Sequence, residues 1–229
     1  MKDELSDKEF FEISKIVYDA AGIHLKKEKK TLVVSRLTKR LGELNIENLE
    51  DYLKMVKSDQ QEHQHFLNCL TTNKTEFFRE DDHFDYLMNN FLLKQSPFYD
   101  KWTFWCAACS TGEEAYSLSM VFDQVLRKTG NDYRGLATDI DTNVLKRAEN
   151  GTYKKDAALK TLPPHFAKQY TKEGPEVHNI RIQDPLKEKL KFKQFNLIES
   201  KLGVPLTFDV IFLRNVLIYF DDETTYYVI

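Results

Sequence analysis

The stretch "WTFWCAACSTGEEAYSLSMVFDQVLRK", residues 102–128, predicts a strand, a tight turn and a helix in succession. Its first seven residues are apolar or small, which is typical of a buried strand. Helical spacing of apolar residues begins after Gly112. The turn in between consists of small residues, which allow the backbone to approach a ligand closely. Because ligands of open α/β sheets bind at the carboxyl ends of the strands, this turn is the first candidate for a binding site.

The same alternation of strand and helix continues along the chain. "RGLATDID" (134–141) predicts a second strand, and "TNVLKRAENG" (142–151) predicts a second helix. Two more strands are expected in "LKFKQFNLI" (190–198) and "FDVIFLRNVLIYF" (208–220). This order indicates a Rossmann-like, doubly wound parallel sheet. Segment 152–189 is irregular and rich in Lys, Pro and Gly, so we expect an insertion or a small subdomain there.

The first seventy residues predict a small bundle of helices. Ser6 and Glu9 fit a capping box, and Gly22 suits the end of the first helix. "TTNKTEFFRE" (71–80) interrupts the helical pattern and is expected to form a loop and a helix cap. We therefore expect a helical domain over residues 1–72 and an α/β domain over residues 73–229.

Composition and charge narrow the class of protein. The chain is 41% hydrophobic and 30% charged, which is ordinary for a globular protein. No apolar stretch approaches the roughly 20 residues that span a bilayer, and residues 1–10 lack the apolar core of a signal peptide. We therefore expect a cytoplasmic protein without membrane insertion. The net charge of −3 gives no general attraction to nucleic acid.

Acidic residues surround the predicted turn. The turn lacks the GxGxxG pattern of dinucleotide sites, and Glu113 and Glu114 in the first helical turn would repel a phosphate but suit a cation. Asp139 and Asp141 end the second strand, where an acid can accept hydrogen bonds from ribose hydroxyls. S-adenosylmethionine combines a ribose with positive charge and has no phosphate. Alternatively, the two glutamates only complement the helix dipole.

The ordered set of motifs resembles the CheR family of chemotaxis receptor methyltransferases. The matching stretches are "TTNKTEFFRE", "CSTGEEAYS", "ATDIDTNVLKRAENGTY", "FNLI" and "FDVIFLRNVLIYF", and the N-terminal "AGIHL…KKTLVVSRLTKRL" also fits. The resemblance implies a Rossmann-like S-adenosylmethionine-dependent methyltransferase sheet, an N-terminal all-helical domain and, at 152–189, a small inserted β-subdomain. It also implies that the chain transfers methyl groups to receptor glutamates, giving glutamyl methyl esters and S-adenosylhomocysteine.

The resemblance assigns roles to individual residues. Arg79 and Tyr219 are the expected catalytic residues, with Tyr219 near the transferred methyl group. The residues expected to bind the cofactor are Asn73, Thr75, Arg79, Ala107, Glu113, Asp139, Asn196, Leu197, Arg214 and Asn215. A glutamate carboxylate is already ionised at neutral pH, because its unperturbed pKa is about 4.3. We therefore expect no general base, no catalytic Cys or Ser, and no metal.

The basic segment 26–40 is the expected contact with the receptor. As a pattern alone, it describes either a solvated helix face or a surface for an acidic partner. The resemblance favours docking of the receptor's helical bundle, and the expected contacts are Lys30, Arg36, Lys39 and Arg40. Gly42 stands where some relatives have another arginine. The loop "KEGPEVHN" is a little short for the receptor-peptide site of some relatives, so tethering by a receptor peptide stays open.

The family continues beyond the last residue of this chain with a helix and three strands. We therefore expect the fourth strand to be an exposed apolar edge, and the chain to self-associate through it or to have low stability. Three other functions stay open: a nucleic-acid methyltransferase, an NAD-dependent dehydrogenase, and a binding or regulatory module without catalysis. The pair Cys106 and Cys109 forms a CxxC pattern, which is expected to serve packing rather than redox chemistry.

Overall fold

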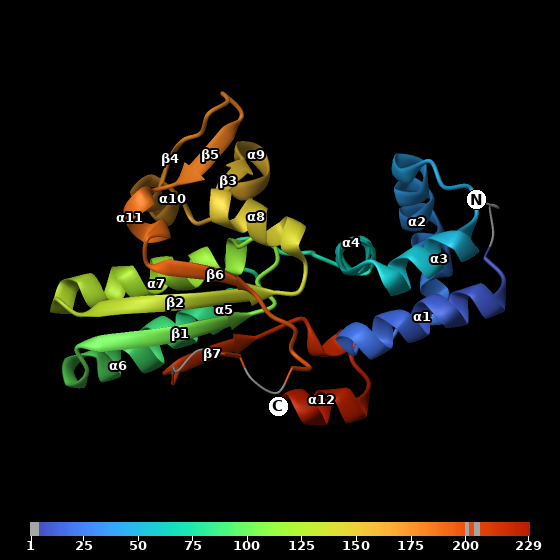
Figure 1. Ribbon diagram of the computed structural model, residues 1–229. Helices are drawn as coiled ribbons and strands as arrows, with labels where there is room; N and C mark the ends of the chain where they lie inside the picture. Colours follow the sequence, from blue (N-terminus) through green and yellow to red (C-terminus); the bar gives the residue numbers. More distant parts are fainter. Residues whose placement is uncertain (1–4, 200–201, 204–206) are drawn as a thin grey trace.

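The N-terminal part of the computed structural model is a bundle of four helices. The structure describes residues 5–199, 202–203 and 207–229. Ser6 and Glu9 form the predicted capping box, and Gly22 ends the first helix in the left-handed conformation. The bundle core includes the fully buried side chains of Ile13, Leu37 and Phe66. The helices, on the right in Figure 1, are α1 (Asp7–Ala21), α2 (Lys30–Leu44), α3 (Leu49–Ser58) and α4 (Gln60–Leu70).

A parallel sheet of four strands forms the centre of the second part and confirms the predicted fold class. The strand order is β6-β2-β1-β7. Trp102, Phe104 and Cys106 of β1 are buried, as expected for a buried strand, and the residues between them are partly exposed. The strands are β1 (Lys101–Ala107), β2 (Asp132–Asp139), β6 (Leu190–Gln194) and β7 (Val210–Leu213).

Helices and helical turns cover and extend this sheet. Helix α7 follows β1 and packs against β2 and a π-helical segment, and α8 packs against β2 and β6. The apolar residues of α7 share one core with the sheet. They include Leu118 and Phe122, which are fully buried. The helical elements are α5 (Asp82–Tyr86), the π-helix Leu87–Leu92, α6 (Leu93–Gln95), α7 (Glu113–Thr129), α8 (Thr142–Asn150) and α12 (Asp222–Val228). No helix among the described residues is long and apolar enough to cross a membrane.

The segment after α8 forms the small β-subdomain that the sequence predicts. Its antiparallel sheet has the order β3-β5-β4 and projects from the main sheet (Figure 1). The elements are β3 (Thr152–Lys154), α9 (Lys155–Ala158), α10 (Pro164–Tyr170), β4 (Thr171–Glu173), β5 (Asn179–Ile182) and α11 (Asp184–Lys187).

The last predicted strand is much shorter than its sequence pattern suggests. Strand β7 ends at Leu213, Asn215 adopts a left-handed conformation with φ 54°, and a 3₁₀ turn follows over Leu217–Tyr219. The positive φ of Asn215 turns the chain out of the sheet, so the strand prediction for 214–220 is wrong. Strand β7 pairs only with β1 among the described residues, and its Ile211 is 54% exposed. Self-association through this edge remains a prediction.

The end of α1 is fixed to the C-terminal segment. The hydroxyl of Tyr18 donates to Asp221 Oδ2 at 2.8 Å, and the backbone N–H of His24 donates to the carbonyl of Tyr219 at 2.8 Å. Gly22 is closely packed here, since a Cβ atom on it would lie 2.7 Å from Thr224 Cγ2. These contacts close one side of a cavity between the helical bundle and the sheet.

Candidate active site

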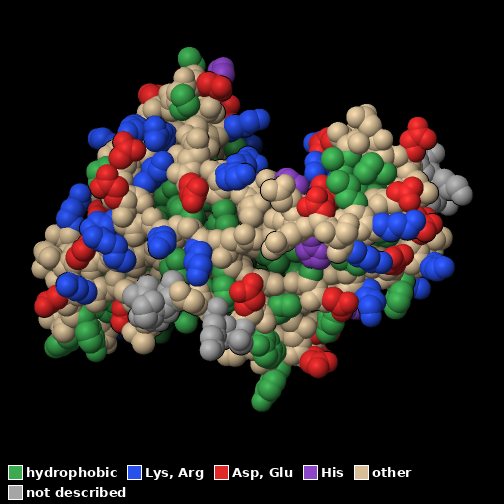
Figure 2. All heavy atoms as spheres, viewed as in Figure 1, with side chains coloured by type: hydrophobic (Ala, Val, Ile, Leu, Met, Phe, Trp, Pro, Cys, Tyr) green, Lys and Arg blue, Asp and Glu red, His purple; other side chains and the backbone are tan. Residues whose placement is uncertain are grey.

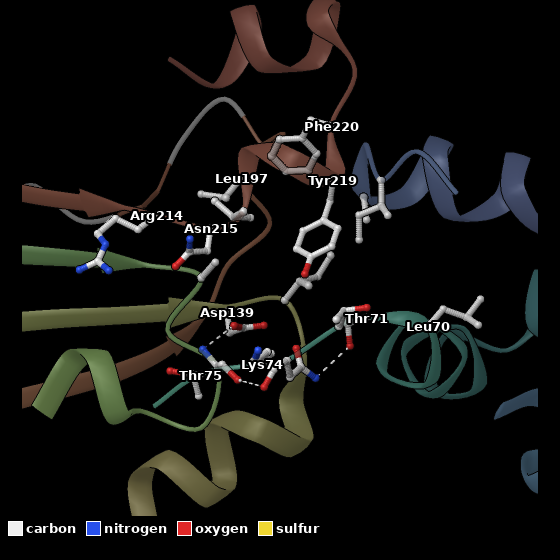
Figure 3. Close-up of a pocket in the computed structure, with 18 of the residues that line it drawn as sticks. Leu70, Thr71, Lys74, Thr75, Asp139, Leu197, Arg214, Asn215, Tyr219 and Phe220 are labelled. Carbon is white, nitrogen blue, oxygen red and sulfur yellow. Dashed lines mark hydrogen bonds between the residues drawn. The ribbon is translucent and has the colours of Figure 1, made fainter. Parts of the chain in front are cut away.

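The cavity lies where the helical bundle faces the carboxyl ends of the parallel strands (Figure 3). It is bounded by the end of α1, the loop that follows α4, the β1–α7 turn, and the segments that follow β2, β6 and β7. The structure brings most of the predicted site residues together here. Those that line the cavity are Asn73, Thr75, Arg79, Asp139, Asn196, Leu197, Arg214, Asn215 and Tyr219.

The β1–α7 turn has an unusual backbone. Ala108 and Ser110 have positive φ values of 59° and 50°, and Gly112 has φ 94°. Non-glycine residues seldom adopt this conformation, and strain of this kind gathers at functional sites. The backbone N–H of Ser110 donates to Asp139 Oδ2 at 2.8 Å, and the N–H of Cys109 donates to the carbonyl of Thr138 at 2.8 Å. The turn is therefore held against the end of β2.

Asp139 stands at the base of the cavity. Its side chain is buried and also accepts a hydrogen bond from the backbone N–H of Asp141 at 2.9 Å. Burial raises the pKa of Asp139 to about 6, although the hydrogen bonds from the backbone act in the opposite direction. Asp139 therefore offers a carboxylate at the end of a parallel strand, which suits ribose hydroxyls.

The loop after α4 is fixed to the same edge of the sheet. The side-chain amide of Asn73 donates to Asp141 Oδ2 at 2.7 Å, and the hydroxyl of Ser110 donates to the carbonyl of Asn73 at 3.0 Å. Thr71 donates to the same oxygen of Asp141 at 2.9 Å. Asn73 thus shapes the cavity wall by joining the loop to the carboxyl end of β2.

Opposite charges gather at one end of the cavity. Arg214 Nη2 donates to the carbonyl of Arg79 at 2.5 Å and lies 3.2 Å from Glu80 Oε2, while Arg214 Nε lies 3.6 Å from Glu114 Oε2. The Asn215 amide donates to Glu80 Oε1 at 3.0 Å. Burial raises the pKa of Glu114, and Arg214 opposes that shift. The carboxylate of Glu114 lies near the guanidinium groups of Arg79 and Arg214. Such a set of charges matches a ligand that carries both an ammonium and a carboxylate.

The remaining residues close the cavity on the side of the C-terminal segment. The ring of Tyr219 points into the cavity (Figure 3). The amide of Asn196 donates to the carbonyl of Ala20 at 2.7 Å, so this residue also joins the helical bundle to the sheet. Leu197 and Phe195 provide apolar surface.

Two predicted residues lie outside this cavity. Ala107 is fully buried as the last residue of β1, and its neighbour Ala108 lines the cavity instead. Glu113 accepts a hydrogen bond from the Thr111 hydroxyl at 2.6 Å and lines a second pocket, toward the β-subdomain. The next residue, Glu114, lines the cavity instead of Glu113. Other lining residues that the sequence did not indicate are Ile23, Leu25, Lys29, Ser110, Ile140, Phe195 and Phe220.

The basic segment does not present the expected set of four cations. Arg36 Nη1 donates to the carbonyl of Thr71 at 2.6 Å, and Arg40 forms a two-bond ion pair with buried Glu62, at 3.0 and 2.5 Å. Lys30 pairs with Asp7 at 3.0 Å, and Lys39 is exposed. In Figure 2, basic and acidic side chains are interspersed over the helical bundle. Contacts within the chain thus engage the guanidinium groups of Arg36 and Arg40, and contact of the four residues with a receptor stays a prediction.

The cysteines of the CxxC pattern are buried free thiols. Burial raises the pKa of both Cys106 and Cys109 well above the ordinary value, which disfavours the reactive thiolate. Their packing in the core supports a structural role. Among the described residues, no group of three or more His, Cys, Asp or Glu side chains is arranged to hold a metal ion.

Comparisons with known proteins match both parts of the chain. The CheR methyltransferase SAM-binding domain matches residues 73–229, and the CheR methyltransferase all-alpha domain matches residues 8–71. This chain belongs to the CheR methyltransferase family. The part of the chain that matches the SAM-binding domain supplies most of the cavity lining, including the buried carboxylate of Asp139, apolar surface and the pair of Glu114 and Arg214.

Individual relatives of this CheR chain are chemotaxis proteins. The chain is 38% identical to the "Chemotaxis protein methyltransferase" of Salmonella typhimurium over 96% of its own length and 76% of the relative. The protein of the same name from Escherichia coli is also 38% identical, with 96% and 77% covered. That of Borreliella burgdorferi is 34% identical, with 97% and 80% covered. These relatives support methylation in chemotaxis.

Proposed function

We propose that the chain transfers the methyl group of S-adenosylmethionine to glutamate side chains of chemotaxis receptors. The products are glutamyl methyl esters and S-adenosylhomocysteine. The observation that carries this proposal is a single cavity, in a CheR chain, that combines buried Asp139, the Glu114–Arg214 pair and the ring of Tyr219. We place the protein in the cytoplasm, where the helical bundles of such receptors are accessible.

Each part of the cavity has a proposed role toward the cofactor. Asp139 accepts hydrogen bonds from the ribose hydroxyls, and Leu197 packs beside the adenine. Glu114 faces the ammonium of the amino-acid end, while Arg79 and Arg214 face its carboxylate. Two buried nitrogens of Arg214, Nε and Nη1, have no hydrogen-bond partner among the described residues and are therefore available for a ligand carboxylate.

The other predicted cofactor residues have supporting roles. Asn73 and Asn196 hold the cavity walls in place through their side-chain amides, and Asn215 is held by Glu80. Thr75 lines the same wall as Asn73. Tyr219 flanks the position of the transferred methyl group and limits the approach of the acceptor.

The chemistry requires alignment rather than proton transfer. The acceptor carboxylate is ionised, and the sulfonium is a good leaving group, so an oxygen attacks the methyl carbon while the carbon–sulfur bond breaks. The protein contributes by holding oxygen, carbon and sulfur in line and by excluding water. No residue is required as a general base.

Labelled methyl transfer tests the proposal. The chain is incubated with methyl-labelled S-adenosylmethionine and a receptor cytoplasmic fragment, and the label is then tested for release by mild base. We expect base-labile label on the receptor, and its loss in Asp139→Asn but not in Asp85→Asn, a control on the exposed surface of α5. Cofactor binding without transfer would instead support a non-catalytic binding or regulatory module.

A further inference from the structure

Four cationic side chains line the cavity, and they differ in what they contact. Arg214 contacts Glu80, Glu114 and the carbonyl of Arg79. Arg79 donates to the carbonyl of Lys74 at 3.2 Å and lies 3.8 Å from Glu80. Lys74 is exposed. The fourth, Lys29, is half-buried and has no side-chain hydrogen bond or ion pair with any residue that the structure describes.

Lys29 is instead placed over the aromatic ring of Tyr219. Its Nζ lies 4.9 Å from the ring centroid, a cation–π distance. Tyr219 is itself fixed, because its carbonyl accepts the backbone N–H of His24 at 2.8 Å. The ammonium of Lys29 therefore stands where the helical bundle meets the C-terminal wall of the cavity.

The local sequence directs only this lysine toward the cavity. Lys29 ends the 3₁₀ turn Lys27–Lys29 directly before α2, and its backbone N–H donates to the carbonyl of Lys26 at 2.9 Å. Lys26 and Lys27 are exposed, and Lys30 pairs with Asp7. The positive end of the α2 dipole lies beside Lys29 and adds to its field.

An anionic acceptor needs a cation at this position. The cavity lining includes the carboxylates of Asp139 and Glu114, which oppose the entry of another carboxylate. The proposed acceptor is a glutamate, whereas the two arginines pair with Glu80 and are assigned to the carboxylate of the cofactor. Lys29 is the half-buried cation of the described lining that neither pairs with a carboxylate of the protein nor is assigned to the cofactor.

We propose that Lys29 binds the acceptor carboxylate at the face of Tyr219, an assignment that rests on the proposed function. One carboxylate oxygen hydrogen-bonds to the Lys29 ammonium while the other attacks the methyl carbon. The carbon–sulfur bond breaks, its electron pair stays on sulfur, and no proton moves. The carboxylate loses its charge as the ester forms, so the contact with Lys29 weakens and the neutral product is released.

This role predicts a particular kinetic signature. Because the carboxylate carries more charge in the ground state than in the transition state, Lys29 contributes to binding more than to the chemical step. In Lys29→Gln, we expect KM for the receptor fragment to rise roughly tenfold, the effect of losing one charge-assisted hydrogen bond. We expect kcat not to fall, the affinity for S-adenosylhomocysteine to stay unchanged, and Lys29→Arg to retain most of the receptor affinity.

The matched control is Lys27→Gln, which removes the same charge from the exposed side of the same turn. Initial rates of labelled transfer give KM and kcat, and calorimetry gives the affinity for S-adenosylhomocysteine. If the wild type transfers methyl groups and Lys29→Gln behaves like Lys27→Gln, the assignment of Lys29 is wrong while the proposed function stands. A fall in kcat at unchanged KM would also overturn it. If the wild type transfers no methyl group, the proposed function fails and the assignment fails with it.

Discussion

Arg40 is predicted to stabilise the helical bundle rather than to bind a receptor. Its guanidinium reaches Glu62 at 3.0 Å from Nε to Oε1 and 2.5 Å from Nη2 to Oε2, and the Tyr52 hydroxyl donates to the same carboxylate at 2.8 Å. The Glu62 side chain is only 4% exposed. Burial alone would raise the pKa of Glu62, but the hydrogen bonds from Arg40 and Tyr52 hold it below the ordinary value.

The substitution Arg40→Met leaves the carboxylate of Glu62 buried without its cation. Removal of one partner of a buried ion pair costs about 3–5 kcal/mol. For a chain of this size, a loss of 1 kcal/mol lowers Tm by about 2–4 °C, so we expect Tm to fall by about 6–20 °C. Adding Glu62→Gln removes the buried charge and keeps an acceptor for Tyr52, so the double variant should recover much of the loss.

Thermal unfolding at neutral pH measures these differences, and urea unfolding gives the corresponding free energies. Lys39→Met is the control, because Lys39 is the exposed neighbour of Arg40 on the same helix. Its Tm should stay close to that of the wild type. The reasoning would be refuted if Arg40→Met kept the wild-type Tm while its affinity for a receptor fragment fell, since that pattern belongs to a docking residue.

Three further predictions concern the cavity and its turn. Since the pKa of Asp139 is raised to about 6 and ribose binding uses its ionised form, affinity for S-adenosylhomocysteine should fall about tenfold per pH unit below 6. Calorimetry from pH 5 to pH 8 covers about one unit below this pKa to two units above it. It should show the fall in affinity in the wild type but not in Asp139→Asn. By the same assay, Glu114→Gln should weaken binding about tenfold and Glu113→Gln should leave it unchanged, because only Glu114 lines the cavity. Gly112→Ala should lower the free energy of unfolding, measured with urea, by about 1–3 kcal/mol. The reason is that Gly112 has φ 94° and that a Cβ atom there would lie 2.8 Å from the Cβ of Ala148. Unchanged stability would contradict the described turn.

Much of the fold was predictable from local patterns, because the helices of the bundle and the strands and helices of 102–151 have clear apolar patterns. The buried strand at 101–107 and the capping box at Ser6 follow directly from residue type and spacing. Asp139 was also predictable, since the end of a parallel strand is a fixed place in the fold. The short β7 was not, because apolar residues continue to Phe220 and nothing in that pattern shows the left-handed turn at Asn215.

The positions of several site residues depend on tertiary contacts that a linear pattern does not contain. Glu113 and Glu114 are adjacent acids in one helical turn, and only the direction of each side chain separates the cavity from the second pocket. Arg36 and Arg40 lie in a basic segment, yet their partners are the carbonyl of Thr71 and buried Glu62, 35 and 22 residues away in sequence. Charge counting identifies a basic helix but does not show which of its cations remain free.

The central claim is that the acceptor is a receptor glutamate. The most direct measurement is to map the transferred methyl group by mass spectrometry on a receptor cytoplasmic fragment, before and after treatment with mild base. The account predicts methyl groups on glutamate side chains, lost in base, and none when Asp139→Asn replaces the wild type. Base-stable methyl groups on other side chains, or cofactor binding with an unmodified receptor, would contradict it.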